Sequence, residues 1–267
     1  MNISVLGCGW LGLPLAKDLI NKGHIVKGST TSQEKFQLLS AEGIIPYQIK
    51  LFEEGIQGDI SSFLNDTEIL IVNIPPGLRN DPKENFIAKI GRLKEKIDRS
   101  HIQHLIFVSS TSVFEDREDM PVYNEEDEPN GTRINSEQLI GAEKLAFSDN
   151  YKTSILRFGG LFGPGRHPVN FLSGKMNVKD PEGPVNLIHR DDCIGIINAI
   201  IESDKSGIFH GVYPEHPKKA NYYKAIAKQE NLALPEFSHE TSSKGKIINS
   251  VRLQEELQFT FGRNLGE

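Results

Sequence analysis

The first half of the chain alternates short apolar runs with segments whose apolar residues recur every three or four positions. Short continuous apolar runs are typical of strands buried on both faces, and the longer period is typical of helices with one buried face. The predicted strands are 3–6, 24–28, 47–51, 68–74, 104–108 and 154–157. The predicted helices are 13–20, 33–42, 85–99, 136–147 and 193–202. This alternation predicts a doubly wound α/β fold, a parallel sheet with helices on both faces.

Three later segments depart from this alternation of strands and helices. Residues 115–133 are acidic and rich in turn-forming residues, which predicts a solvated surface loop. A glycine-rich loop follows at 159–165, and Asp191 or Asp192 is expected to cap the helix 193–202. Residues after about position 206 predict a small mixed lobe rather than a continuation of the alternating pattern.

The stretch 2–13 contains the most specific motif. The first predicted strand leads into Gly7-x-Gly9-x-x-Gly12, and a helical pattern follows directly. This context is the one that a dinucleotide-binding loop requires: a tight turn at the first glycine, close phosphate approach at the second, and close helix packing at the third. We therefore expect the loop, including Trp10 and Leu11, to hold a cofactor pyrophosphate at the helix N-terminus. The alternative is a plain strand-to-helix turn.

Composition narrows the class of protein. The 267 residues fit one large domain, or a domain with a small lobe, and the net charge of −6 argues against a nucleic-acid surface. No apolar run reaches the roughly 18 residues of a membrane span, and the first residues lack a signal-peptide pattern. The two cysteines, Cys8 and Cys193, are too few for a disulfide framework, so we expect reduced thiols and a cytoplasmic protein.

Four segments, taken in order, resemble the extended short-chain dehydrogenase/reductases, the NAD(P)-dependent epimerase/dehydratase family. They are the glycine loop 7–12, the Ser-Ser-Thr-Ser-Val-Phe stretch within 108–114, the Leu-Phe-Gly-Pro-Gly-Arg stretch within 156–166, and 187–192. The resemblance covers essentially the whole chain. It implies a Rossmann-like core over 1–160, to which 185–205 returns, and a small C-terminal substrate lobe from 161–184 and 206–267. The chain is short for the family, which implies a trimmed substrate lobe.

The chain departs from the family at its catalytic pair. Family members use Tyr-x-x-x-Lys, with a nearby serine that orients the substrate oxygen. Ser110 matches that serine, but the register fixed by Glu143-x-Leu145 places Asn135 at the tyrosine position and Leu139 at the lysine position. A slip of one residue gives Ser136 and Ile140, and Tyr-x-x-x-Lys occurs nowhere in the chain.

This substitution removes the acid/base group. A phenol can be tuned toward neutrality by an adjacent cation, whereas an amide at Asn135 exchanges no proton in this range and Leu139 carries no charge. A substrate that supplies its own acid, or a residue from elsewhere, would have to act with Ser110. The candidate replacements are Tyr123, Arg133, Glu137, His167 and His189. A surface or packing role is the simpler interpretation of each.

Cofactor choice depends on the end of the second predicted strand. NAD-preferring proteins place a carboxylate there to accept from the ribose 2′-hydroxyl. This chain has Thr30, Thr31 and Ser32, followed by Lys35, so we expect NADP in preference to NAD. These residues could equally cap the following helix. The resemblance also places Ile74 and Pro75, after the fourth predicted strand, beneath the cofactor.

The substrate side is indicated by the resemblance at Arg166 and His167, where Arg166 could bind a phosphate or carboxylate. His189 and Asp192 match a further family segment. No metal site is expected, because the spacing His101-x-x-His104 lacks a matching set of ligands. No Gly-x-Ser-x-Gly elbow is present, which argues against a hydrolase.

The sequence leaves two functions open, beside a third interpretation in which a Rossmann-like domain binds no cofactor. The first is an NADP-binding oxidoreductase or epimerase-like enzyme with an altered active site, acting on a small molecule. The second is a non-catalytic dinucleotide-binding sensor or scaffold, which the missing tyrosine and lysine favour. Family members often dimerise through the helices that correspond to 85–99 and 136–147, so a homodimer is possible.

Overall fold

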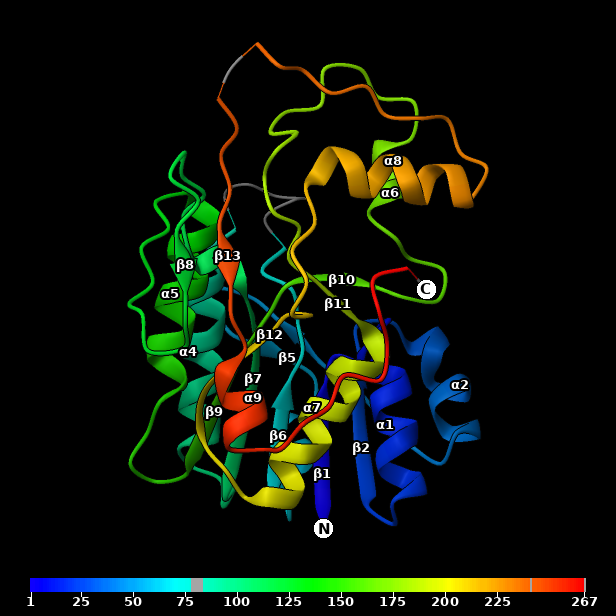
Figure 1. The fold of residues 1–267 in the computed structure, drawn as a ribbon. Helices are drawn as coiled ribbons and strands as arrows, with labels where there is room; N and C mark the ends of the chain where they lie inside the picture. Colours follow the sequence, from blue (N-terminus) through cyan, green and yellow to red (C-terminus); the bar gives the residue numbers. More distant parts are fainter. Residues whose placement is uncertain (78–83, 241, 267) are drawn as a thin grey trace. The chain divides into compact units, whose positions relative to one another are not determined.

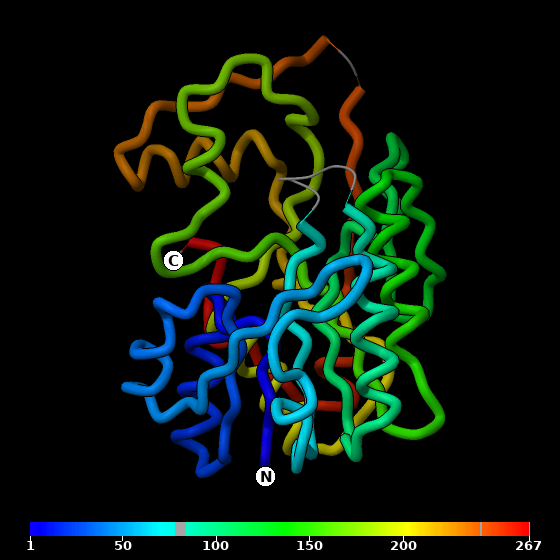
Figure 2. Tube along the Cα trace, turned by 180° about the vertical axis from the view of Figure 1, so that it is seen from behind, coloured from blue at the N-terminus to red at the C-terminus, as the bar shows by residue number. Residues whose placement is uncertain are grey.

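The structure is a computed structural model that describes residues 1–77, 84–240 and 242–266. The chain divides into two compact units (Figures 1 and 2). Unit 1 comprises Met1–Ser109, Arg133–Leu156 and Ile200–Ile208. Unit 2 comprises Ser110–Thr132, Arg157–Ala199 and Phe209–Glu267. Three strands begin in unit 1 and end in unit 2: β7, β9 and β12. Helix α7 begins in unit 2, and its last residues belong to unit 1.

A seven-stranded sheet carries the fold, in the order β12-β9-β7-β6-β1-β2-β3. Its strands are β1 (Asn2–Leu6), β2 (Ile25–Thr30), β3 (Ile45–Gln48), β6 (Ile69–Val72), β7 (His104–Ser110), β9 (Lys152–Phe158) and β12 (Gly207–Gly211). The pairs β1–β2, β1–β6, β2–β3 and β6–β7 are all parallel. The predicted doubly wound α/β fold is therefore confirmed.

The strand order reverses at β1. The chain runs outward from β1 through β2 to β3, then returns to β6 on the other side of β1 and runs outward through β7. Ligands of doubly wound sheets bind beyond the carboxyl ends of the strands at such a reversal. The glycine loop lies at the carboxyl end of β1, so the topology places it at the expected point.

The helices of unit 1 are α1 (Gly12–Asn21), α2 (Phe36–Ala41), α3 (Ile60–Leu64), α4 (Phe86–Ile97) and α5 (Ile134–Ala146). Helices α4 and α5 lie side by side in both views (Figures 1 and 2), and the Ile87 amide donates to Gln138 Oε1 at 3.0 Å. Gly141 permits this approach, since a Cβ there would lie 2.3 Å from Ile87 Cδ1.

Some element boundaries differ from the sequence pattern. The predicted helix 33–42 is a 3-10 turn, η1 (Gln33–Lys35), followed by α2. The predicted strand 47–51 is split, because β3 ends at Gln48 and β4 (Lys50–Leu51) pairs antiparallel with β5 (Ile56–Gln57). The short helix α3 carries no long apolar period and was not predicted.

Unit 2 is built from shorter elements. They are η2 (Thr111–Val113), β8 (Val122–Tyr123), β10 (Gly160–Phe162), α6 (Val169–Leu172), β11 (Leu187–His189), α7 (Arg190–Ser203), α8 (Lys219–Gln229), β13 (Ile247–Ile248) and α9 (Val251–Glu255). The pairs β10–β11 and β8–β13 are parallel. A core cluster joins α8 to the β10–β11 pair and to Leu265 near the end of the chain.

Candidate functional site

The three glycines of the loop have different steric surroundings, each of which fits its place in the motif. Gly7 has a φ of +107°, and a Cβ there would lie 2.3 Å from the Asn73 carbonyl oxygen. A Cβ on Gly12 would lie 2.1 Å from the Gly7 carbonyl oxygen. Gly9 is exposed, and apart from the glycine itself and its two chain neighbours no residue has a heavy atom within 4 Å of the position its Cβ would take. Backbone atoms thus crowd Gly7 and Gly12, whereas Gly9 faces open space.

The start of α1 is suited to an anion. Leu11 occupies the N-cap position but makes no side-chain capping bond, and the first turn contains no acidic residue. In this turn the Leu13 amide donates to the Gly9 carbonyl at 3.0 Å and Pro14 has no N–H. The helix terminus therefore offers an anion the positive end of its dipole and the amides of the loop before Leu13. Leu11 is buried and Trp10 is partly exposed, so the loop offers backbone rather than charged side chains to a phosphate.

Contacts with β2 fix the loop. The Gly7 amide donates to Ser29 Oγ at 2.9 Å, and the Cys8 amide donates to the Ser29 carbonyl at 2.8 Å. The Cys8 thiol fills the space left by Gly28, where a Cβ would lie 2.6 Å from Sγ. Burial raises the pKa of Cys8 to about 12, so the thiol packs and does not react.

The end of β2 presents hydroxyl groups. Thr30 Oγ1 accepts from the Ser32 amide at 3.2 Å, which closes a local turn. Ser32 occupies the N-cap position of η1 but makes no side-chain capping bond, so the capping alternative is wrong for this hydroxyl. Thr31 and Lys35 are exposed. No carboxylate occupies the strand end.

The residues just after β6 contact the glycine loop. Asn73 Nδ2 donates to the Gly7 carbonyl at 3.1 Å, and Ile74 Cγ2 would be 3.0 Å from a Cβ on Gly7. Pro75 follows and is exposed. These contacts join the ends of β1 and β6, the two strands at the reversal.

The positions that match the family's catalytic residues are divided between the units: Ser110 belongs to unit 2, and Asn135 and Leu139 belong to unit 1. Ser110 ends β7 and caps η2, its Oγ accepting from the Ser112 amide at 3.2 Å. Since that bond uses a lone pair, the hydroxyl proton of Ser110 can be donated elsewhere. In unit 1, Asn135 is exposed in the first turn of α5, and Leu139 is buried. Leu139 therefore fills core space and does not supply a charge.

The neighbouring Ser109 makes a contact that the sequence did not indicate. Its hydroxyl donates to Glu143 Oε1 at 2.5 Å, and both side chains are buried in unit 1. Glu143 lies on α5. This bond ties α5 to the end of β7 and commits Ser109 to structure.

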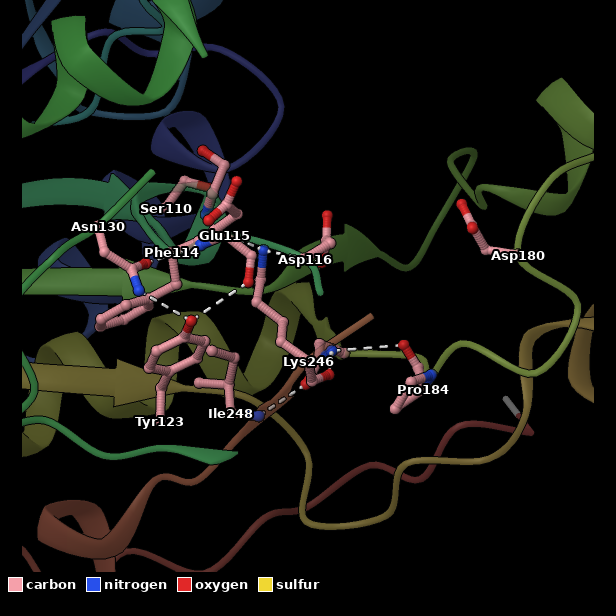
Figure 3. A network of polar contacts seen from close by, with 12 residues as sticks. Ser110, Phe114, Glu115, Asp116, Tyr123, Asn130, Asp180, Pro184, Lys246 and Ile248 are labelled. Atoms are coloured by element: carbon pink, nitrogen blue, oxygen red, sulfur yellow. Dashed lines mark hydrogen bonds and ion pairs between the residues drawn. The ribbon is translucent and has the colours of Figure 1, made fainter. Parts of the chain in front are cut away.

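Most residues of the acidic segment 115–133 are exposed, as expected for a solvated surface loop, but Tyr123 and Glu125 within it are buried. Tyr123 stacks on Phe114 with ring centroids 4.5 Å apart, and its hydroxyl accepts from Asn130 Nδ2 at 3.0 Å (Figure 3). Glu125 is also buried and accepts from the amides of His210 and Arg252. The Phe114 ring covers Tyr123, and the backbone amides of the distant residues His210 and Arg252 hold Glu125. Local composition does not predict this burial.

Lys246 supports the same segment and was missed by sequence reasoning. It is buried, and its Nζ donates to the Phe114 carbonyl at 2.7 Å and lies 3.1 Å from Asp116 Oδ1 (Figure 3). Its partners lie about 130 positions earlier in the chain. No local motif marks such a contact. The ammonium therefore holds the backbone that follows Ser110.

The other replacement candidates are occupied or exposed. Arg133 and Glu137 are exposed at the start of α5. His167 Nδ1 accepts from the Val169 amide at 3.1 Å, and its Nε2 lies 3.0 Å from the Tyr222 hydroxyl. Both His167 nitrogens are thus committed to structure, and burial lowers the pKa of the ring. Arg166 is exposed in the same loop.

The expected cap at Asp191 or Asp192 is wrong. Helix α7 begins at Arg190, and His189 Nδ1 accepts from the Asp191 amide at 3.1 Å. Asp192 instead accepts from the Gly262 amide at 2.7 Å through Oδ1. The imidazole precedes the helix and reaches its first turn, which leaves the carboxylate to fix the C-terminal segment.

No helix in the described ranges combines the length and apolar character needed to cross a bilayer. Among residues 1–77, 84–240 and 242–266, no three His, Cys, Asp or Glu side chains are grouped to hold a metal ion.

Comparison with known proteins gives relatives along nearly the whole chain. No family model matches. The chain is 32% identical over 264 residues to Protein YeeZ of Escherichia coli (strain K12), covering 97% of this chain and 95% of that protein. It is 24% identical over 240 residues to a 3-diazoavenalumate denitrifying reductase of Streptomyces sp, covering 79% and 75%.

Solved structures share the fold. UDP-glucuronic acid 4-epimerase from Bacillus cereus, in complex with NAD, matches with a TM-score of 0.81 at 16% identity, covering 100% of this chain and 93% of that one. UDP-glucose 4-epimerase from Thermotoga maritima, with UDP-glucose, matches with a TM-score of 0.79 at 18% identity, covering 100% and 96%. At these identities the likeness establishes the epimerase-like fold.

Proposed function

Because the chain belongs to the extended short-chain dehydrogenase/reductase family, we propose that it binds a nicotinamide dinucleotide at the glycine loop and acts as an oxidoreductase on a small molecule. The observation that carries the proposal is the contrast within the loop. Gly7 and Gly12 are closed by backbone, whereas Gly9 faces open space beside the uncapped start of α1. That arrangement suits a pyrophosphate, and the NAD held by the solved epimerase supports the same ligand class.

We propose NADP as the preferred cofactor. A 2′-phosphate would meet hydroxyls at Thr31 and Ser32 and the ammonium of Lys35, with no carboxylate at the strand end to repel it. Ile74 and Pro75 would border the adenosine side. When bound, the nicotinamide ring supplies a hydride donor or acceptor.

The chain's own contribution to chemistry centres on Ser110. Its hydroxyl proton is available to a substrate oxygen, because the bond to the Ser112 amide uses only a lone pair. Asn135 can orient a polar group but cannot exchange a proton, and Leu139 supplies no cation. The proposed reaction therefore draws its proton from the substrate or from water. The reductase from Streptomyces, at 24% identity, supports redox chemistry in a related chain.

Titration calorimetry with NADP and then NAD tests the binding proposal on the full chain. We expect micromolar binding of NADP and weaker binding of NAD. Lys35→Gln should weaken NADP about tenfold, through loss of a charge-assisted contact, and leave NAD unchanged. Tighter binding of NAD overturns the NADP preference, and no binding of either nucleotide overturns the proposed function.

The buried Leu139 favours a second function, a non-catalytic nucleotide sensor. Ser110→Ala separates the two. If the protein is an enzyme, removal of the hydroxyl donor lowers turnover about a hundredfold, measured by nicotinamide absorbance with any substrate found. Ser112→Ala, an exposed neighbour, serves as the matched control. Equal turnover in both variants argues against a catalytic role for Ser110.

A further inference from the structure

A pocket of about 630 Å³ lies at the edge of the sheet where the strands begin, which the N-terminus of the chain marks in Figure 1. Its lining residues come from the start of β1, from 61–68, where α3 leads into β6, and from 96–103, where α4 leads into β7. All of them belong to unit 1. The glycine loop lies at the other end of β1, so this pocket is separate from the proposed nucleotide site. Its size lies within the range of small-molecule sites, roughly 300–1,000 Å³.

Backbone hydrogen bonds hold the three strand starts together. The Glu68 amide donates to the Asn2 carbonyl at 2.9 Å, and the Gln103 amide donates to the Glu68 carbonyl at 2.8 Å. The Asn2 amide donates in turn to Glu68 Oε1 at 2.8 Å. The sheet therefore fixes the walls of the pocket, and the Glu68 carboxylate is engaged in this framework.

The wall 61–68 carries an available carboxylate at Asp66. This side chain is exposed, and within the described ranges its one hydrogen bond is accepted from the neighbouring Asn65, Nδ2 to Oδ2 at 2.6 Å. The Lys27 ammonium acts on Asp66 only through space, since its Nζ donates to the carbonyls of Ser62 and Asn65. Asp66 therefore keeps unused lone pairs on this wall.

The wall 96–103 carries three basic residues without partners: Lys96, Arg99 and His101. In the part of the chain that the structure describes, none of them donates a hydrogen bond or lies within 4.0 Å of a carboxylate oxygen. The other basic side chains of α4 are paired: Lys89 with Glu84, Arg92 with Glu95, and Lys94 with Asp98. The basic residues left without a carboxylate are thus those that line the pocket.

The helix dipole explains only part of this arrangement. Basic residues are favoured near the C-terminal end of a helix, which accounts for Lys96 and Arg99. His101 lies beyond the helix, and Asp66 brings the opposite charge from a different segment. Asp66 and these bases line one pocket without forming an ion pair among the described residues, so both walls can interact with a bound molecule.

We propose that this pocket binds a small zwitterion, with its carboxylate on Lys96, Arg99 and His101 and its ammonium group on Asp66. Charge decides this class of ligand. The basic wall attracts an anion that Asp66 repels, and the reverse holds for a cation. A molecule with both charges gains from both walls, and each of its groups forms charge-assisted hydrogen bonds. The inference does not depend on nucleotide binding.

The test follows the His101 imidazole in the full chain by NMR with ¹⁵N-labelled histidine, and His101→Gln assigns the resonance. Glycine, 4-aminobutyrate and 6-aminohexanoate are titrated separately, because they hold the two charges at increasing distances. Each is compared with the carboxylate and the amine of the same length, which carry one charge only. We expect saturable movement of the His101 signal with at least one amino acid, and binding at least tenfold weaker for its matched carboxylate and amine.

Variants identify the ligands. Asp66→Asn removes the charge and keeps the shape, and asparagine also adopts the φ of +54° found at this position. This variant and Arg99→Gln, both at exposed positions, should each weaken the amino acid about tenfold. Asp149→Asn and Arg92→Gln are matched controls, since both are exposed residues of unit 1 outside the pocket.

Three results would overturn the proposal. They are no saturable movement at tens of millimolar of any amino acid, equal affinity for an amino acid and its matched carboxylate or amine, and an unchanged midpoint in Asp66→Asn. Gly9→Ala should leave the titration unchanged, so a failure of this site and a failure of nucleotide binding are distinguishable.

Discussion

Gly9→Ala separates nucleotide binding from folding in a single substitution. The added methyl group meets no heavy atom within 4 Å beyond Gly9 and its two chain neighbours, and Gly9 does not require a positive φ. The free energy of unfolding should therefore change by no more than about 0.5 kcal/mol. The open space that accepts this methyl group is the space proposed for the pyrophosphate.

The loss of binding can be estimated from contact distances. A phosphate oxygen accepts from a backbone N–H at a distance of about 2.9 Å. A methyl group beside that N–H occupies space that the phosphate needs, so the oxygen cannot come this close. Losing one charge-assisted hydrogen bond costs about 1.5–3 kcal/mol. The dissociation constant for NADP should then rise by about ten- to a hundredfold.

Calorimetric titration and urea unfolding, measured on the same preparations, give both quantities. Gly12→Ala is the contrasting variant, since its Cβ would lie 2.1 Å from the Gly7 carbonyl oxygen. Overpacking of this kind should destabilise that variant by about 1–3 kcal/mol. If Gly9→Ala binds NADP as tightly as the native chain, the pyrophosphate does not approach Gly9 and the reasoning fails.

Three further results are expected. Cys8 should not react with iodoacetamide at neutral pH in the native protein, because burial raises its thiol pKa to about 12. Lys246→Met should destabilise the chain by about 1–3 kcal/mol in urea unfolding, because it leaves the buried Phe114 carbonyl without its donor. Stability should fall by up to about 3 kcal/mol as the pH drops from 6.5 toward 4, because burial lowers the pKa of His210 to about 4 and only the unfolded chain takes up that proton.

Each of these has a control. Unfolding in urea should expose Cys8 to the reagent, and rapid labelling of the native chain would contradict its burial. Lys244→Met, two positions earlier and exposed, should leave stability nearly unchanged. His210→Phe should remove its share of the pH dependence, and an NMR titration of His210 near pH 6.5 would refute the assignment.

The sequence alone determined the parts of this protein that depend on neighbouring residues. Apolar runs and periods predicted the parallel α/β fold, since burial of a strand or helix face requires that spacing wherever the element lies. The Gly7-x-Gly9-x-x-Gly12 motif predicted the turn at the carboxyl end of β1. Gly12 is needed because it packs on the Gly7 carbonyl inside the motif, and Gly7 is needed because it packs on the Asn73 carbonyl just after β6. The absence of Tyr-x-x-x-Lys is likewise a property of the chain itself.

Tertiary structure decided what depends on residues far apart in the chain. The sequence places Tyr123 in an acidic surface loop, but in the structure its ring is buried against Phe114. Lys246, far away in the sequence, donates to the Phe114 carbonyl. His189, not Asp192, meets the first turn of α7, which leaves the Asp192 carboxylate to accept from the distant Gly262 amide. A local sequence pattern predicts which face of its own helix or strand a residue occupies. Which partner satisfies a buried polar group depends on how the elements pack, and this only the folded chain specifies.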